Sequence, residues 1–269
     1  MSESTDHPVS HVASSGCIDT SGLQLEWAEA PWDTAIYGFM VLQITRLEVR
    51  GRTASQDLVA FERAREATGS GLVSCRLQHD RLRESMLLEE AGFRFIEMLY
   101  LPEFDLSTLD AASNDGDLQI VRATQADLPQ VLQIAGTAFR NERFHIDPRL
   151  SPELSDKRYQ SWARSSLCHP TQQLFVISDG EKKVVAFFVT ELLSDGTCYW
   201  HLNAVAPEYQ GNGYGRRAWS AMLEHARVNG ARRVRTSIVA RNHRVLNLYA
   251  RLGFRFPPPL MTFHWVRPA

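Results

Sequence analysis

The segment that decides the fold is residues 205–215, which read Val-Ala-Pro-Glu-Tyr-Gln-Gly-Asn-Gly-Tyr-Gly. An apolar run typical of a strand precedes it, and residues 216–229 follow with the spacing of a helix. Glycines permit tight turns that leave consecutive backbone N–H groups accessible, and a helix N-terminus adds unpaired donors and a positive dipole end. The segment therefore predicts an anion cradle, to which Arg216 and Arg217 add charge.

Two nucleotide-binding motifs do not fit this segment. A P-loop needs Lys-Ser or Lys-Thr after its last glycine, and no such pair follows here. A dinucleotide fingerprint needs G-x-G-x-x-G, whereas Gly211, Gly213 and Gly215 are spaced G-x-G-x-G. A glycine turn with a purely structural role stays as the alternative to the cradle.

The pattern around the cradle mixes strands and helices. Strands are expected at 118–122, 174–178, 183–192, 197–205, 234–239 and 261–266, and helices at 124–139, 155–166, 216–229 and 242–252. Turn residues at 179–180 and 194–196 predict that the strands between 174 and 205 form an antiparallel meander. The fold class expected is α+β.

The first half of the chain has a similar but shorter pattern. Residues 1–20 are rich in Ser, Thr and His and are expected to form a disordered tail, while 21–106 form a first domain. Within it we expect strands at 23–27, 41–49, 72–77 and 93–101 and helices at 55–68 and 81–91. The polar segment 107–117 predicts a linker, so 118–269 forms the second domain.

The two halves share a helix, a glycine and a strand in that order. Residues 88–95 resemble 249–256, but Leu88 stands where the second copy has Tyr249, and no glycine-rich turn precedes it. The shared pattern is either a frequent way for a helix to end before a strand or an internal repeat. In both cases any chemistry is expected in the second half.

Composition excludes several classes of protein. Of 269 residues, 29 are Lys or Arg and 31 are Asp or Glu, and a net charge of −2 argues against general nucleic-acid binding. No apolar run reaches the ~20 residues of a membrane span, and the start lacks the features of a secretory signal, so a cytoplasmic location is expected. Four dispersed cysteines suggest neither disulfides nor zinc, and His145 and His169 lack further ligands nearby, so no metal is expected.

Two motifs together resemble a known family. Residues 205–215, read as V-x-P followed by Q-x-x-G-x-G, resemble the [Q/R]-x-x-G-x-[G/A] signature of the GNAT superfamily of N-acetyltransferases. Residues 242–254, N-x-x-V-x-x-L-Y-x-x-x-G-F, are similar to its second motif. The resemblance spans 118–268 and implies the GNAT fold, a mixed and mostly antiparallel sheet with flanking helices, here after a smaller degenerate GNAT-like α/β domain.

The family resemblance also implies a cofactor and residues that bind it. The cofactor is acetyl-CoA, whose pyrophosphate is expected on the glycine-rich turn and whose pantetheine arm is expected along the strand that ends at Val205. The implied cofactor-binding residues are Ala204, Val205, Gln210, Gly211, Asn212, Gly213, Tyr214, Gly215, Arg216 and Asn242. Asn242 is equally suited to a second role as a helix N-cap.

A looser resemblance extends into the first half. The residues Trp32-Asp33, Tyr37-Gly38, Ala138-Phe139, Arg143-Phe144, Tyr159 and Trp162 resemble the dTDP-fucosamine acetyltransferases of bacterial surface-polysaccharide synthesis. This implies an amino sugar, carried on a nucleotide, as the acceptor. We expect the substrate to meet Arg143, Phe144 and Asn203. A local group of arginines, at 140, 143, 149, 158 and 164, suits a diphosphate, although for each one an exposed structural role is the alternative.

Acetyl transfer to an amine needs an acid for the departing thiolate and a base for the amine. The resemblance implies that Tyr249 is the acid. His201 is the candidate base, because residues 199–203 contain no carboxylate and Tyr199, His201 and Asn203 are expected on one face of their strand. A hydrogen-bonded structural histidine is the alternative, and an amine that arrives uncharged needs no strong base. Since the cysteines lack a histidine at motif spacing, direct transfer in a ternary complex is expected.

Other functions fit the same motifs. The acceptor amine is alternatively a polyamine, an antibiotic, an amino acid or a protein amine. A non-catalytic acyl-CoA-binding regulatory module is an alternative of another class. Exposed edge strands would permit a homodimer, whereas packing of the two domains as an intramolecular pseudo-dimer would make a monomer sufficient.

Overall fold

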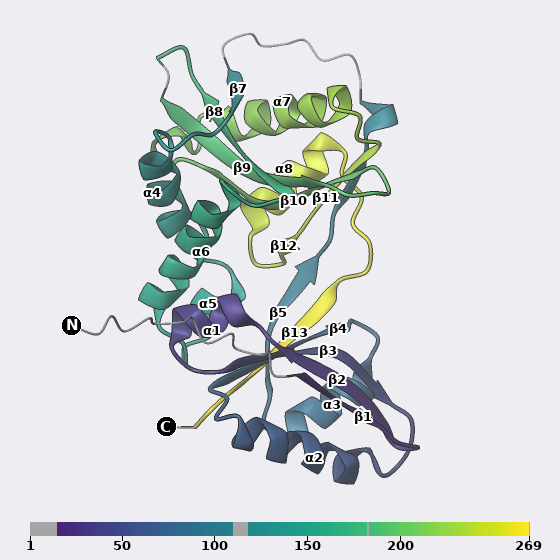
Figure 1. Ribbon diagram of the computed structural model, residues 1–269. Coiled ribbons are helices and arrows are strands. Elements are labelled where there is room, and N and C mark those ends of the chain that lie inside the picture. The colour runs from purple at the N-terminus through teal and green to yellow at the C-terminus, as the bar shows by residue number, and fades with distance from the viewer. Residues whose placement is uncertain (1–14, 110–117, 182, 269) are drawn as a thin grey trace, which may run out of the picture. The chain divides into compact units, whose positions relative to one another are not determined.

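The computed structural model describes residues 15–109, 118–181 and 183–268, and the described residues form two compact units (Figure 1). Of the described residues, unit 1 contains those up to Leu77, Arg81–Arg94 and those from Phe263 on, and unit 2 contains Gln78–Asp80 and those between Phe95 and Thr262. The chain passes between them inside two strands, β5 (Arg94–Tyr100) and β13 (Leu260–Val266). The linker expected at 107–117 lies outside the described residues from position 110 on, and the domain borders stay predictions.

Unit 1 is a small α/β body. Its strands lie side by side in the order β1 (Ser15–Asp19), β2 (Leu23–Glu29), β3 (Val41–Val49), β4 (Leu72–Gln78) and β13. Its helices are α1 (Pro31–Tyr37), α2 (Ala54–Ala67) and α3 (Leu82–Glu90). Residues 1–14 of the expected tail lie outside the described residues. For Ser15–Asp19 the prediction of a disordered tail is wrong, because these residues pair with β2 and thereby satisfy their backbone groups.

Buried apolar side chains explain why unit 1 folds as it does. Phe61 of α2 is fully buried and meets the edge of Trp27 from β2 at 5.1 Å between ring centres. Phe93, directly after α3, is also fully buried, and Gly92 ends that helix with φ +84°. The periodic positions read from the sequence therefore face one core.

Unit 2 is built around a six-stranded sheet. The strands lie in the order β6 (Glu103–Asp105), β11 (Arg233–Thr236), β10 (Thr197–Val205), β9 (Val184–Leu192), β8 (Gln172–Ser178) and β7 (Gln119–Arg122). The predicted antiparallel meander is confirmed, since β8, β9 and β10 pair antiparallel in sequence order. Among the described strands of this sheet, only β10 and β11 pair in parallel. The expected α+β class is thus confirmed.

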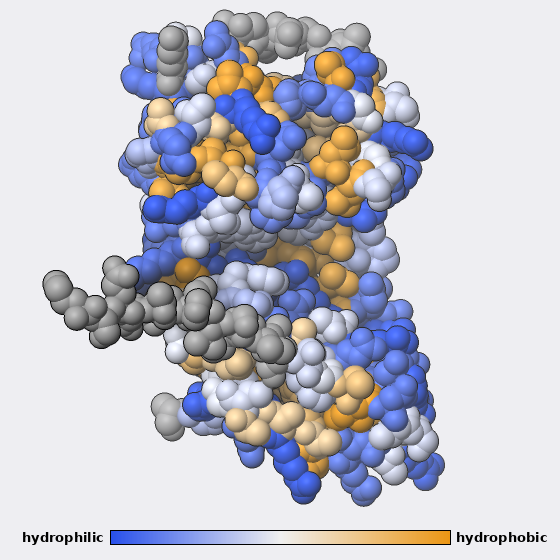
Figure 2. Space-filling view, in the orientation of Figure 1, coloured by the Kyte–Doolittle hydropathy of each residue, from blue (hydrophilic) through white to orange (hydrophobic). Residues whose placement is uncertain are grey.

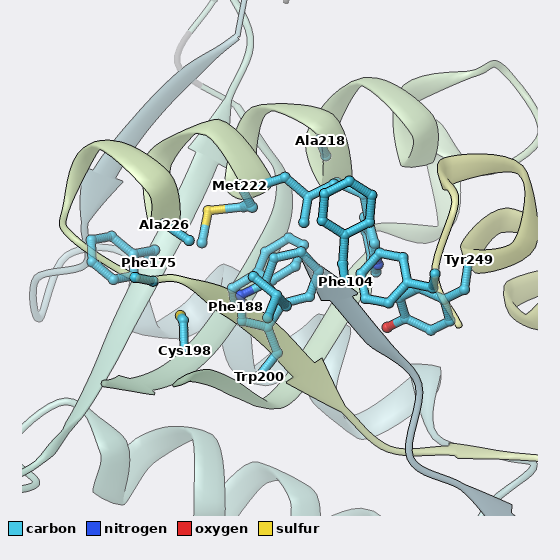
Figure 3. Close-up of a cluster of buried hydrophobic side chains, with 14 of the residues drawn as sticks. Phe104, Phe175, Phe188, Cys198, Trp200, Ala218, Met222, Ala226 and Tyr249 are labelled. Atoms are coloured by element: carbon cyan, nitrogen blue, oxygen red, sulfur yellow. The ribbon is translucent and has the colours of Figure 1, made fainter. Parts of the chain in front are cut away.

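Helices cover both faces of this sheet. On one face α4 (Leu128–Ala138) and α6 (Pro152–Ser166) pack against Leu174, Phe187, Val189 and Leu202. On the other, α7 (Tyr214–Val228) and α8 (His243–Leu252) enclose a cluster that includes Phe188 (Figure 3). A short helix, α5 (Arg143–Ile146), lies between α4 and α6, where no helix was expected from the sequence.

The parallel strands β10 and β11 diverge halfway along β10. Their pairing starts at Thr197 with Arg233 and ends at Trp200 with Thr236. The chain after β11 then forms β12 (Ile238–Val239), which pairs with β5 instead. The predicted strand 234–239 is therefore two strands. Within the described residues, no strand pairs with the edge of residues 201–205 that faces away from β9.

A β-bulge lies at this point of divergence. The register between β10 and β9 shifts between Trp200 and Leu202, so His201 is an extra residue on β10. As a result Trp200 belongs to the α7/α8 cluster, whereas Leu202 and Ala204 belong to the α4/α6 cluster. Without the bulge all three would share a face, because side chains alternate along a strand. The expectation that Tyr199, His201 and Asn203 share one face is therefore wrong.

Among the described residues, no helix combines the length and the apolar character needed to cross a membrane. Hydrophilic side chains cover much of the visible face, interrupted by smaller groups of hydrophobic ones (Figure 2). Single exposed hydrophobic side chains, such as Val228 at 70% exposure, are ordinary on protein surfaces.

Candidate functional site

The glycine-rich turn exposes a continuous row of backbone donors. Gly211 and Gly213 have φ values of +86° and +81°, a conformation that favours glycine, and a Cβ atom at either one would meet nothing within 4 Å. These two glycines are therefore needed for backbone conformation rather than for space. Within the described residues, the N–H groups of 211–216 have no hydrogen-bond acceptor. This row satisfies the requirement of the predicted anion cradle.

Side chains hold the turn in place from both ends. The Gln210 amide Nε2 donates to the Val205 carbonyl oxygen at 3.0 Å, and Arg244 donates to Gln210 Oε1 at 3.0 Å. The Tyr209 hydroxyl donates to Asp179 Oδ2 at 2.7 Å, which raises the pKa of Tyr209 to about 12 and lowers that of Asp179. Hydrogen bonds thus connect the turn to β10, to α8 and to the β8–β9 connection.

Positive charge and apolar surface adjoin the donors. Arg216 is exposed, and the Arg217 guanidinium lies 5.2 Å from the ring centre of Tyr214. A Cβ atom on Gly215 would lie 3.7 Å from Leu248 and 3.8 Å from Val205, which is ordinary contact, so alanine would fit there. Leu248 and Val205 are only partly buried. The α7/α8 face thus offers an apolar wall beside the cradle.

Helix α8 places Tyr249 at the far end of the α7/α8 cluster, the apolar cluster that includes Phe188 (Figure 3). Asn242 caps this helix, because its Oδ1 accepts a hydrogen bond from the Val245 N–H at 3.3 Å. The Tyr249 side chain is 1% exposed, and its hydroxyl donates to Asn203 Oδ1 at 3.2 Å. Burial raises the pKa of Tyr249 to about 12, so the phenol is protonated at neutral pH and able to donate.

The structure separates His201 from Tyr249. Because of the bulge, His201 faces α6, where its ring centre lies 6.0 Å from that of Trp162, whereas Asn203 faces α8 and Tyr249. The two residues proposed as base and acid therefore lie on opposite faces of β10. Asn203, expected to contact the substrate, forms a hydrogen bond with Tyr249.

A carboxylate absent from the predicted site lies next to His201. Glu191 of β9 accepts a hydrogen bond from His201 Nε2 at 2.9 Å. Glu191 was missing from the predicted site because it lies on β9 and not on the strand of His201 itself. The available signal was the alternation in β9, which together with the meander turn places Glu191 opposite Tyr199.

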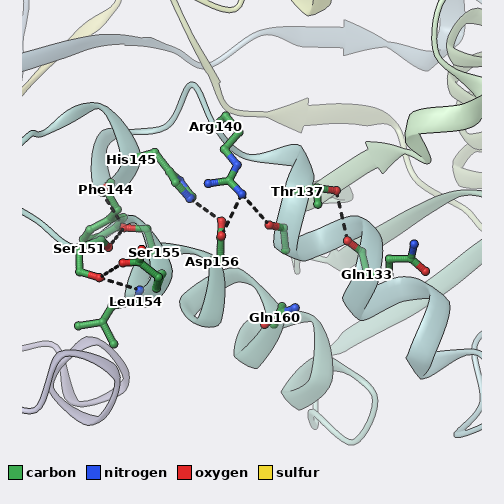
Figure 4. A network of polar contacts seen from close by, with 12 residues as sticks. Gln133, Thr137, Arg140, Phe144, His145, Ser151, Leu154, Ser155, Asp156 and Gln160 are labelled. Atoms are coloured by element: carbon green, nitrogen blue, oxygen red, sulfur yellow. Dashed lines mark hydrogen bonds and ion pairs between the residues drawn. The ribbon is translucent and has the colours of Figure 1, made fainter.

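The expected substrate residues are arranged around α5. Phe144 is 2% exposed and lies under two guanidinium groups, at 4.5 Å from Arg143 and 4.3 Å from Arg158. Asp156 of α6 binds Arg140 at 3.0 Å and His145 Nε2 at 2.7 Å (Figure 4). Phe144 thus supports the arginines from below rather than forming an open surface.

The five arginines that were expected to bind a diphosphate differ in the contacts that they make. Arg140 is paired with Asp156, and Arg149 forms two bonds of 2.8 Å with Asp147. Arg158 stacks over Phe144 and also lies 5.4 Å from the ring centre of Tyr159. Arg164 is exposed. For Arg140 and Arg149 the structural alternative is therefore favoured.

Taken by geometry alone, the site suits an extended molecule with a phosphate group at one end. The cradle offers donors to the phosphates, and the free edge of β10 offers backbone groups to amides of an extended arm. Along β10 this path ends where Tyr249 meets Asn203. Acetyl-CoA has such a diphosphate, such an arm and a thioester at its end, so the residues present fit it.

Comparisons with known proteins agree with this geometry. Residues 130–254 match the model of the acetyltransferase (GNAT) family. A curated relative, the spore coat polysaccharide biosynthesis protein SpsD of Bacillus subtilis (strain 168), is 23% identical over 138 residues, which are 51% of this chain and 47% of that protein. The chain thus spans about half the length of the curated relative it matches.

Solved structures extend the likeness in fold to both units. A GCN5-related N-acetyltransferase from Sphaerobacter thermophilus has a TM-score of 0.64 at 14% identity, covering 94% of this chain and 83% of its own. A functionally unknown conserved protein from Staphylococcus epidermidis ATCC 12228 has a TM-score of 0.68 at 14% identity, covering 95% of both chains. Because coverage includes unit 1, the fold of a smaller GNAT-like domain before the second one is confirmed.

Proposed function

Because residues 130–254 match the model of the acetyltransferase (GNAT) family, we propose that this chain belongs to that family and transfers the acetyl group of acetyl-CoA directly to the amino group of a nucleotide-linked amino sugar. The observation that carries this proposal is the row of unpaired N–H groups at 211–216, which continues into the free edge of β10 and ends beside the phenol of Tyr249. The N–H groups suit an anion, the strand edge suits an extended arm, and the phenol suits a leaving group that needs a proton.

Each part of the site has a task toward acetyl-CoA. The N–H groups of 211–216, with Arg216, would hold the diphosphate, and the edge at Asn203–Val205, apart from the Val205 carbonyl that accepts from Gln210, would hold the arm. When bound, acetyl-CoA supplies an acetyl group already activated as a thioester. Tyr249 donates its proton from the phenol oxygen to the departing sulfur, and its raised pKa of about 12 keeps that proton available.

Two observations support the acceptor class. The α5 region gathers Arg143 and Arg158 over an apolar base, and guanidinium groups bind diphosphates well. SpsD is named for polysaccharide biosynthesis, which supports a sugar as the acceptor. The dTDP-linked 4-amino-4,6-dideoxygalactose of the fucosamine acetyltransferases is the specific acceptor we propose. A cytoplasmic location and a homodimer remain predictions of the sequence.

The test is an acceptor panel with acetyl-CoA and a reagent that detects free thiol. We expect thiol release with the nucleotide-linked amino sugar and little with a polyamine, an amino acid or a lysine peptide. Arg143→Ala should raise the KM for the nucleotide-linked sugar roughly tenfold, in line with loss of one charged hydrogen-bonding group. Arg63→Ala, an exposed arginine on α2, is the matched control and should leave KM unchanged.

Other outcomes of the panel would replace the proposal. Thiol release with a different amine only would reassign the acceptor while keeping the reaction. Tight binding of coenzyme A without thiol release for any amine would support a regulatory acyl-CoA-binding module.

A further inference from the structure

We infer that Glu191 is a positioning residue for acetyl transfer, because it holds the His201 ring so that Nδ1 receives the proton of the acceptor amine on the face of β10 opposite Tyr249. This inference rests on the proposed function. It adds a residue from a neighbouring strand, and it assigns the acid and the base to different faces of the sheet.

The bulge brings His201 to the right place along β10. His201 is the first residue after the last parallel pair, Trp200 with Thr236, so it lies at the level where the free edge begins. Tyr249 reaches the same stretch of β10 from α8, through Asn203. The gap between the diverging strands therefore has a phenol on one face and an imidazole on the other.

The acceptor region lies on the same face as His201. The Arg158 guanidinium is 5.5 Å from the ring centre of Trp162, and the Trp162 ring centre is 6.0 Å from that of His201. Both Arg158 and Trp162 belong to α6, which covers the face opposite α7 and α8. An amine that enters beside these side chains would meet His201 before it meets Tyr249.

The hydrogen bond with Glu191 fixes which ring nitrogen is free. Glu191 Oε2 lies 2.9 Å from His201 Nε2, and the two side chains are 20% and 19% exposed. A carboxylate can only accept, so Nε2 carries the hydrogen and Nδ1 carries the lone pair. For Nδ1 the described part of the chain provides no hydrogen-bond partner. The imidazole thus presents an unpaired acceptor.

The surroundings keep the imidazole neutral. Burial lowers the pKa of His201, while the hydrogen bond and charge of Glu191 oppose this and His169 adds to it. Hydrogen bonding with Thr171 lowers the pKa of Glu191, so the carboxylate stays ionised. Tyr199 lies 4.8 Å from His201 between ring centres, and α6 contributes the uncharged Trp162 ring. A neutral imidazole beside an ionised carboxylate is suited to accept a proton.

The transfer step balances with these groups. The amine nitrogen forms a bond to the acetyl carbon as the carbon–sulfur bond breaks, and the sulfur keeps the electron pair of that bond. The amine proton passes to His201 Nδ1, and the Tyr249 hydroxyl proton passes to the sulfur. The products are an acetamide and a free thiol, and solvent returns the proton from His201 to Tyr249.

The first test is a double-mutant cycle. Glu191→Gln should lower kcat roughly tenfold to a hundredfold, and His201→Gln about a hundredfold. If Glu191 acts through His201, the double variant should be no slower than His201→Gln alone. Full addition of the two losses would overturn the inference. Glu181→Gln removes an exposed carboxylate before β9 and is the matched control, with kcat unchanged.

A second readout would not respond to a merely structural role. In kcat/KM the low-pH limb should reflect His201, so activity is lost as pH falls through its lowered pKa. Glu191→Gln removes a charge that raises this pKa, so the limb should move to lower pH. A limb that does not move, with wild-type rates intact, would contradict the role of Glu191.

A third measurement is made on the wild-type chain, so it does not depend on whether a Glu191 variant folds. Nitrogen NMR of labelled histidines in the wild-type chain should show His201, identified by its absence in His201→Gln, as the Nε2–H tautomer. An Nδ1–H tautomer would overturn the inference. Absence of thiol release by the wild type would instead refute the proposed function, and the NMR result would still report on the Glu191 pair.

Discussion

The hydroxyl group of Tyr249 donates a hydrogen bond of 3.2 Å to Oδ1 of Asn203. This contact joins α8 to β10 just beyond the point where β10 and β11 diverge. It orients the phenol toward the free strand edge and accounts for a polar group at the end of an otherwise apolar cluster. The contact is the structural basis for treating Tyr249 as the acid.

Replacement of Tyr249 by phenylalanine tests this role. Tyr249→Phe removes only the hydroxyl group, so we expect kcat to fall by about 10²-fold or more, while the affinity for coenzyme A is retained. Steady-state rates and calorimetric titration of coenzyme A measure the two quantities. An unchanged kcat would remove Tyr249 from the reaction.

The pH dependence of kcat provides a test of the same group. Tyr249 acts in its protonated form, and burial raises its pKa to about 12. Deprotonation therefore begins to matter only as pH rises toward that value, and the profile should show no alkaline loss attributable to Tyr249 below about pH 10, the ordinary pKa of tyrosine. An alkaline limb near pH 9 that disappears in a Tyr249 variant would contradict this assignment.

The cradle glycines can be tested with a matched pair. Gly213→Ala places a side chain at φ +81°, which costs about 1 kcal/mol or more and displaces the local N–H groups. We expect the affinity for coenzyme A to fall at least about tenfold. Gly180→Ala is the control, because a Cβ there also meets nothing within 4 Å but needs no left-handed conformation. Equal affinity in the two variants would contradict the cradle.

The thiol groups are expected to take no part in catalysis. Burial raises the pKa of Cys198 to about 11 and that of Cys75 to about 12, so both are poor nucleophiles at neutral pH. Cys198→Ala and Cys168→Ala should each leave kcat within a few-fold of the wild type. Loss of activity at constant thermal stability in either variant would support transfer through an acetylated cysteine.

The fold was largely predictable because the residues at which its helices and strands begin and end can be recognised from the local sequence. Glycines at 213 and 253, both with positive φ, mark the start of α7, two residues before the predicted position, and the end of α8 at the predicted position. Hydrophobic alternation gave β10 its observed bounds, 197–205. The elements missed, such as α1, α5, β1 and β6, are short, and β6 is defined by pairing with the distant strand β11.

The site was less predictable because it depends on pairing between strands. A single extra residue at His201 reverses the face of every residue that follows in β10, and no residue type in 197–205 signals it. Unit 1 has a bulge in the equivalent place, between Glu26 and Trp27 in the pairing of β2 with β3. Sequence periodicity alone cannot locate such a shift, since it is fixed by the partner strand.

The most direct test of the account is a crystal structure of the chain with coenzyme A. We expect the diphosphate on the N–H groups of 211–216 and the sulfur within hydrogen-bonding distance of the Tyr249 hydroxyl. A diphosphate bound elsewhere, or a sulfur on the side of β10 that faces α6, would contradict it.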